Sequence, residues 1–192
     1  MTREMILQEA YALFEAEGIQ NMRMRKIAEK LGIDKKELCE YFPDKRELVW
    51  RSVEYGIGRL DNVLEDIGHK FPNPVEILVR TAVTAFDAFS RMQWAFVEDV
   101  EGCPAAIDII HDERYKIQKN QPIVFRQAVE EGYMRGEAYY DLLLRFFWEQ
   151  FMAQGRTRDE AMRVLFSILR GVATEKGWKK IELIRTEMNL QY

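Results

Sequence analysis

The sequence predicts an all-α protein in which an N-terminal three-helix domain, residues 1–46, is fused to a helical domain formed by residues 47–192. Apolar residues recur at spacings of three and four along most of the chain, as on the buried face of a helix. The five prolines and eleven glycines separate long segments rather than short ones, which argues against a β-sandwich. With 192 residues, 47% of them hydrophobic, the chain can bury a sizeable core.

Three short helices are expected in the N-terminal domain. The first covers residues 2–17 and is followed by Gly18, which suits a helix C-cap. The second runs over residues 24–31, with apolar side chains on one face, and Gly32 makes the turn that follows it. The third covers residues 34–42, since an aspartate at its start can cap the backbone N–H groups and a proline follows its end.

The second domain is predicted to consist of longer helices. Acid-capped or Pro-containing starts at Asp44 and Asn73 open two of them. A capping box, Thr157 to Glu160, opens another, which we expect Gly177 to end before a short closing helix. The remaining helices are expected at 104–116, 121–131 and 137–154, with a connector at 132–136.

Charge and cysteine content restrict the class of protein. The net charge is −4, yet residues 20–51 hold nine Lys/Arg and six Asp/Glu, a local excess of three positive charges. A small basic region on an acidic protein fits contact with nucleic acid through one end only. Two distant cysteines indicate a reducing compartment, and neither a signal segment nor an apolar run of about 18 residues is present, so we expect a cytoplasmic protein.

Residues 24–42 read as two short helices joined by a tight turn that contains Gly32. This arrangement is typical of a helix-turn-helix, in which the second helix enters the major groove of DNA. The pattern therefore predicts a DNA-binding protein whose remaining residues regulate the binding.

Several motifs in register extend this interpretation. They are Phe14-x-x-x-Gly18, Ile27-Ala28, Leu31-Gly32-Ile33, Tyr41-Phe42 and Lys45. Over residues 2–50 the chain resembles the TetR family of bacterial transcriptional regulators. The resemblance implies a homodimer on double-stranded operator DNA, a pocket for a small-molecule effector in the C-terminal domain, and dimerisation through the helices at 137–154 and after Thr157.

The resemblance also places the DNA contacts. Cys39 stands where family members usually carry a tyrosine that touches phosphate, so Arg23, Lys35 or Lys36 is expected to replace it as a phosphate anchor. Lys45 lies in the first turn of the next helix, where its ammonium and the backbone N–H groups can hold one phosphate. The predicted DNA-binding residues are Arg23, Arg25, Lys26, Lys35, Lys36, Glu40, Tyr41 and Lys45. The alternative for each is a solvated helix surface.

Two further sets of residues are candidates in the C-terminal domain. The predicted effector-binding residues are Phe86, Phe89, Met92, Trp94, Phe125 and Trp148, with plain core packing as the alternative. The predicted dimer interface comprises Phe147, Phe151, Leu165, Ile168 and Val172.

No residue pattern carries catalysis, a cofactor or a metal. The two histidines, His69 and His111, are far apart, and neither a phosphate-binding loop nor a nucleophile-base order occurs. The sequence therefore favours a regulator, a repressor released from its operator by a small molecule. The alternative is a helical sensor or scaffold that has lost DNA binding, with Glu37, Glu40 and Cys39 as traces of that loss.

Overall fold

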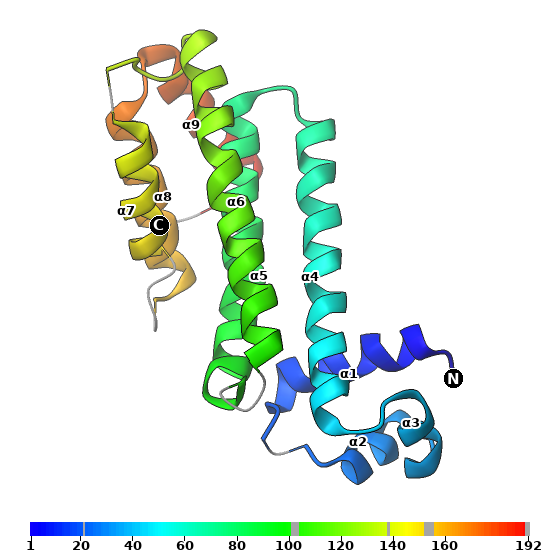
Figure 1. The fold of residues 1–192 in the computed structure, drawn as a ribbon. Helices are drawn as coiled ribbons and strands as arrows, with labels where there is room; N and C mark the ends of the chain where they lie inside the picture. The colour runs from blue at the N-terminus through cyan, green and yellow to red at the C-terminus, as the bar shows by residue number, and fades with distance from the viewer. Residues whose placement is uncertain (21, 101–103, 138, 152–155, 191–192) are drawn as a thin grey trace. The chain divides into compact units, whose positions relative to one another are not determined.

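The computed structural model describes residues 1–20, 22–100, 104–137, 139–151 and 156–190, without the side chains of 91–100, 141 and 151. The described residues form helices and a single isolated bridge, which confirms the all-α prediction. In order, the helices are α1 (Arg3–Glu17), α2 (Met24–Leu31), α3 (Lys35–Tyr41), α4 (Lys45–Lys70), α5 (Pro74–Val100), α6 (Pro104–Glu130), α7 (Tyr140–Phe151), α8 (Arg158–Val172) and α9 (Glu175–Glu187) (Figure 1). None of the described helices is long and apolar enough to cross a membrane.

The helix ends in the N-terminal domain follow the predicted signals. Asp34 caps α3, as predicted, by accepting a hydrogen bond from the Lys36 N–H. Thr2, for which no cap was predicted, caps α1 by accepting from the Met5 N–H. The capping box that opens α8 is also present, with Thr157 and Glu160 each bonded to the other's backbone N–H. Local side-chain chemistry was therefore sufficient to locate the starts of α3 and α8.

The two helices predicted at 104–116 and 121–131 are one helix, α6, and the prediction of a break between them was wrong. Pro122 lies inside α6. A proline removes one backbone hydrogen bond and crowds the preceding turn, which usually ends a helix. Here burial of Ile117, Gln121, Phe125 and Ala128, at helical spacing on both sides of the proline, favours continuation.

The prediction that Gly177 ends a helix was also wrong. Helix α8 ends at Val172, and Gly177 lies in the first turn of α9, where Thr174 is the N-cap and accepts from the Gly177 N–H at 3.1 Å. The carbonyl oxygen of Tyr133, in the connector before α7, lies where a Cβ on residue 177 would be. Gly177 therefore allows the backbone of Tyr133 to approach α9 closely, and it does not form a turn.

The contacts divide the chain into two compact units. One consists of Met1–Asn62 and Ser90–Arg114, and the other of Val63–Phe89 and Tyr115–Tyr192. Helices α4, α5 and α6 each contribute residues to both units. The boundary expected between residues 46 and 47 separates a DNA-binding domain from a regulatory domain, which is a different division from these two units. That boundary stays a prediction. In the second unit, α7 packs against α8 and α8 against α9.

Candidate DNA-binding surface and effector cavity

A left-handed glycine makes the turn between α2 and α3. Gly32 has φ +68°, a conformation that residues with a Cβ rarely adopt. Its N–H donates to the Glu29 carbonyl at 3.2 Å, and the N–H of Ile33 donates to the Ala28 carbonyl at 3.1 Å. These bonds satisfy carbonyls at the end of α2 and start α3 three residues later.

A small apolar core fixes the position of α3. Ile6 and Phe14 of α1, Ile27 of α2, and Leu38 and Phe42 at α3 are fully buried. Because Leu38 and Phe42 share one face of α3, the opposite face is left to solvent. The packing thus presents a short helix with its polar face outward, as a helix that reads the major groove requires.

The predicted DNA-binding cations differ in how they are engaged. Arg23, Lys35 and Lys36 are exposed, and their charged groups have no ion-pair partner within the part of the chain that the structure describes. Arg25 is exposed but pairs with Glu29 at 3.1 Å. Lys26 donates to Glu17 at 3.1 Å, so it joins α2 to the end of α1. The three unpaired cations are the ones available to phosphate without breaking a contact.

Glu17 is the acceptor of two lysines. Lys30 pairs with one of its carboxylate oxygens at 2.5 Å and Lys26 with the other at 3.1 Å. These hydrogen bonds, from Lys30 first and then from Lys26, lower the pKa of the Glu17 carboxyl. The pairing holds α1 and α2 together at the surface of the domain.

The far end of α3 is in contact with the start of the chain. The Tyr41 hydroxyl donates to the Met1 carbonyl at 3.0 Å, while Glu37 lies 3.6 Å from the Met1 amine. Tyr41 is 37% exposed, and Glu40 beside it is exposed. Lys45, half-buried, begins α4, whose backbone is capped by Asp44 through the Glu47 N–H at 2.9 Å.

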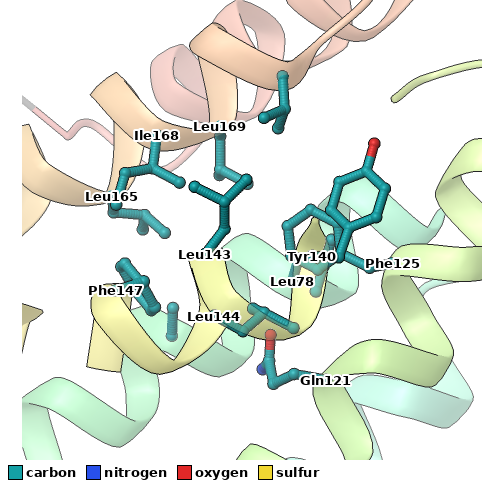
Figure 2. Close-up of a pocket in the computed structure, with 12 residues that line it drawn as sticks. Leu78, Gln121, Phe125, Tyr140, Leu143, Leu144, Phe147, Leu165, Ile168 and Leu169 are labelled. Carbon is teal, nitrogen blue, oxygen red and sulfur yellow. The ribbon is translucent and has the colours of Figure 1, made fainter. Parts of the chain in front are cut away.

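A nearly closed apolar cavity lies in the second unit, between side chains of α5, α6, α7 and α8 (Figure 2). Its volume is about 20 Å³, room for about one water molecule. The lining consists of Leu78, Ala82, Gln121, Phe125, Tyr140, Leu143, Leu144, Phe147, Leu165, Ile168, Leu169 and Val172. An effector of ordinary size, which needs a pocket of about 300 Å³ or more, would have to open it.

Two polar side chains reach this apolar lining. Gln121 is only 6% exposed, and its amide has no hydrogen-bond partner among the described residues. The Tyr140 hydroxyl is buried without a partner, its ring packs on Phe125 with centroids 5.1 Å apart, and burial raises its pKa. Figure 2 shows the Tyr140 hydroxyl pointing away from Gln121. A buried polar group without a partner costs about 1–3 kcal/mol, so each is a candidate ligand contact.

The structure places the predicted effector-binding residues differently from one another. Phe125 lines the cavity. Phe86, Phe89 and Trp148 are buried but do not line it, so their role as effector contacts stays a prediction. The side chains of Met92 and Trp94 lie outside the described part of the chain. The effector-binding residues were predicted mainly from aromatic side chains, whereas most residues that line the cavity are aliphatic.

The predicted dimer-interface residues that the structure describes face the interior of the protomer. Phe147 and Leu165 are buried inside the protomer, and the half-buried Ile168 and Val172 line the same cavity. The assignment of these residues to a dimer interface stays a prediction. The side chain of Phe151 lies outside the described residues. Because α7 is apolar on two faces, composition alone does not tell which face turns inward.

The two faces of α7 are clear in the structure. Tyr140, Leu143, Leu144 and Phe147, at intervals of three, one and three, line the cavity. Arg145 and Glu149 of α7 are exposed. Three large apolar side chains are exposed as well, away from the cavity: those of Tyr139, which directly precedes α7, Leu142 and Phe146, with exposed fractions of 84%, 57% and 52%. We call these three residues the outer face of α7. Their spacing of three and four was readable in the sequence.

Comparisons with known proteins agree with this geometry. Residues 6–50 match the family model described as bacterial regulatory proteins, tetR family. The HTH-type transcriptional repressor KstR2 of Mycobacterium tuberculosis is 28% identical over 146 residues, 73% of this chain and 73% of that protein. The solved structure of this ketosteroid transcriptional regulator has a TM-score of 0.62 and 24% identity, covering 90% of this chain and 95% of the other.

Two further solved structures share the fold. A TetR-family transcriptional regulator, PfmR from Thermus thermophilus, matches with a TM-score of 0.63 and 22% identity over 86% of this chain and 97% of its own. A TetR-family regulator from Agrobacterium tumefaciens matches with a TM-score of 0.71 and 12% identity over 90% and 97%.

Proposed function

We propose that this chain is a transcriptional repressor of the TetR family, released from its operator by a small molecule, since residues 6–50 match the tetR-family model and the repressor KstR2 is 28% identical over 146 residues. The observation that carries the proposal is the match of residues 6–50 together with the α2–turn–α3 geometry. In that geometry Gly32 sets the angle and the buried Leu38 and Phe42 hold the polar face of α3 outward. A protein of this kind acts where the chromosome is, in the cytoplasm.

DNA binding is assigned to the outward surface of α2 and α3. Arg23, Lys35 and Lys36 supply positive charge that is not already used within the described chain, and each can neutralise one phosphate. Glu40 and Tyr41 lie on α3, where they can reach base edges or sugar-phosphate. Lys45 at the start of α4 adds a phosphate contact beside backbone N–H groups.

Effector binding is assigned to the cavity lined by α5, α6, α7 and α8. The signal passes through α4, which begins at Lys45, three residues after Phe42, and runs without interruption to Lys70. An effector that opens the cavity favours a second arrangement of the helices, and a changed tilt of α4 changes the separation of the two recognition helices of a dimer. Recognition helices in such dimers must match one or more DNA turns of about 34–36 Å.

The dimer is assigned to the outer face of α7. Three large apolar side chains in helical register, Tyr139, Leu142 and Phe146, are exposed there in the protomer. A contiguous exposed apolar face is a usual mark of a protein-protein contact. Because α7 packs on α8, two copies of this pair can form a four-helix arrangement.

The test begins with selection of bound sequences from random double-stranded DNA, using protein freed of co-purified small molecules. Affinity for the selected sequence is then measured by fluorescence anisotropy between about 50 and 200 mM salt, a range over which a protein with several phosphate contacts loses affinity steeply. We expect Lys35→Gln to reduce the slope of log affinity against log salt by about 0.9, the value for one lost phosphate contact.

Lys119→Gln is the matched control, since Lys119 is an exposed lysine on α6 outside the α2–α3 surface, and its slope should equal that of the parent protein. Lys26→Gln should change the slope less than Lys35→Gln, because Lys26 is engaged with Glu17. Failure to recover any specific sequence would contradict the proposal and favour the sensor or scaffold that has lost DNA binding.

A further inference from the structure

A second space lies beside the cavity in the same unit. It is an open hollow of about 480 Å³, lined by Pro122, Arg126, Val129, Gly136, Tyr139, Tyr140 and Leu142. Tyr139 and Leu142 also belong to the outer face of α7, so the hollow borders the proposed dimer contact. The cavity holds about 20 Å³, so the hollow is far larger. Of the described residues that line the two spaces, Tyr140 is the one that they share.

The two spaces lie on adjoining faces of the same two helices. On α6, Gln121 and Phe125 line the cavity, while Pro122 and Arg126, each one position later, line the hollow. Leu143 of α7 lines the cavity, Tyr139, the residue before α7, lines the hollow, and Tyr140, the first residue of α7, lines both. The rings of Tyr140 and Phe125 pack together with centroids 5.1 Å apart, and Tyr140 lines both spaces, so its ring forms the wall that the cavity and the hollow share.

Two hydrogen-bond donors, Arg126 and the Tyr140 hydroxyl, lie at this wall. Arg126 is exposed in the hollow and has no hydrogen-bond or ion-pair partner among the described residues. The Tyr140 hydroxyl is buried and lacks an acceptor in the same part of the chain. Both groups are donors, and a guanidinium remains charged at all relevant pH values, so the wall favours an anion or a strong acceptor.

We propose that the effector is an anionic amphiphile whose apolar chain enters the cavity and whose acidic head lies in the hollow on Arg126. This proposal rests on the proposed function and specifies the effector class for the same site. Displacement of the Tyr140 ring joins the two spaces, and its hydroxyl then donates to the head group.

Calorimetric titration of the full-length protein with three probes of one chain length tests the proposal. The probes are octanoate, octanamide and octylammonium, all below their micelle concentrations. We expect octanoate to bind about tenfold more tightly than octanamide, the effect of one charge-assisted bond of about 1.4 kcal/mol, and octylammonium to bind most weakly.

Two variants assign the effect to the wall. Arg126→Gln should remove the preference for octanoate over octanamide, whereas Lys119→Gln, an equal change of charge on the same helix, should preserve it. Tyr140→Phe should weaken octanoate binding about fivefold, because the carboxylate head loses the hydroxyl that would donate to it. Thermal melts should show that both variants remain folded.

Equal binding of the three probes, tighter binding of octylammonium, or binding of none of them would overturn the proposal. A preference for octanoate that persists in Arg126→Gln would overturn it as well. DNA binding without any probe is measured separately, so absence of a specific DNA complex counts against the repressor function, while the calorimetric preference reports on the effector class alone.

Discussion

Lys180 of α9 donates a hydrogen bond of 3.0 Å to Glu76 of α5, which joins two helices that lie 104 residues apart in the chain. The other carboxylate oxygen of Glu76 accepts two bonds from Arg80, at 2.8 and 2.9 Å. Glu76 is 8% exposed, so this carboxylate is one of the few buried charges among the described residues and carries three charge-assisted bonds.

Replacement of the Glu76 charge should make stability less dependent on acid. Burial raises the pKa of Glu76, but the bonds from Lys180 and Arg80 outweigh it and hold the pKa below its usual value. A carboxylate with a lowered pKa in the folded state stabilises the protein above its unfolded pKa of about 4.3, and the contribution is lost as pH falls through the folded pKa. We expect Glu76→Gln to lower the free energy of unfolding at pH 7 by about 1.5 kcal/mol. The deficit should shrink as pH falls below 4.

Glu175→Gln provides the control for this measurement. Glu175 pairs with Lys179 at 2.7 Å, but both side chains are exposed on the outside of α9. Such a pair contributes about 0.5 kcal/mol or less, so urea unfolding should detect little change at any pH. If the Glu76→Gln deficit stayed constant down to pH 3, the pairing would not be the source of its stability.

A methyl group at position 177 should destabilise the protein although alanine favours helices. A Cβ there would meet the Tyr133 carbonyl, a backbone group that cannot rotate away. We expect Gly177→Ala to cost about 2 kcal/mol, as overpacking does. Gly68→Ala, in α4 where a Cβ would meet nothing within 4 Å, should instead stabilise by about 0.5–1 kcal/mol. Thermal unfolding of the two variants measures both signs, and a stabilising Gly177→Ala would contradict the observed close approach.

The sequence was most informative where structure is decided by neighbouring residues. Asp34 and Thr157 act on backbone N–H groups two or three positions away, so the starts of α3 and α8 followed from local chemistry. Pro122 and Gly177 were misread for the opposite reason. Whether a proline interrupts α6, or a glycine serves close approach, depends on contacts with distant segments such as the one that contains Tyr133. The same limit applies to the faces of α7, where Phe147 and Phe146 are equally apolar in sequence but lie inside and outside the protomer.

Removal of the unpartnered amide in the cavity should stabilise the protein. Gln121 is buried without a hydrogen bond in the described structure, and methionine has nearly the same shape without the polar group. We expect Gln121→Met to raise the free energy of unfolding by about 1 kcal/mol, the desolvation cost that is relieved. Gln118→Met, an exposed position one turn earlier on α6, should change it by less than about 0.5 kcal/mol. A loss of stability in Gln121→Met would show that the amide is satisfied in the protein as it exists in solution.

Substitution on the outer face of α7 should separate the proposed dimer into protomers without unfolding it. Phe146 is 52% exposed, so Phe146→Ser removes little packing within the protomer but takes a large apolar side chain out of the proposed contact. An aromatic residue at the centre of an interface contributes about 2 kcal/mol or more, which weakens dimerisation about thirtyfold. Sedimentation equilibrium over a range of protein concentrations measures the shift. Tyr115→Ser is the control, because Tyr115 on α6 is 65% exposed and lies outside the outer face of α7. A dimer of unchanged affinity in Phe146→Ser would contradict this assignment of the interface.

Since one protomer presents only one α3 to DNA, a monomeric Phe146→Ser should also lose most of its affinity for a two-half-site operator while keeping weak, salt-sensitive binding to each half-site.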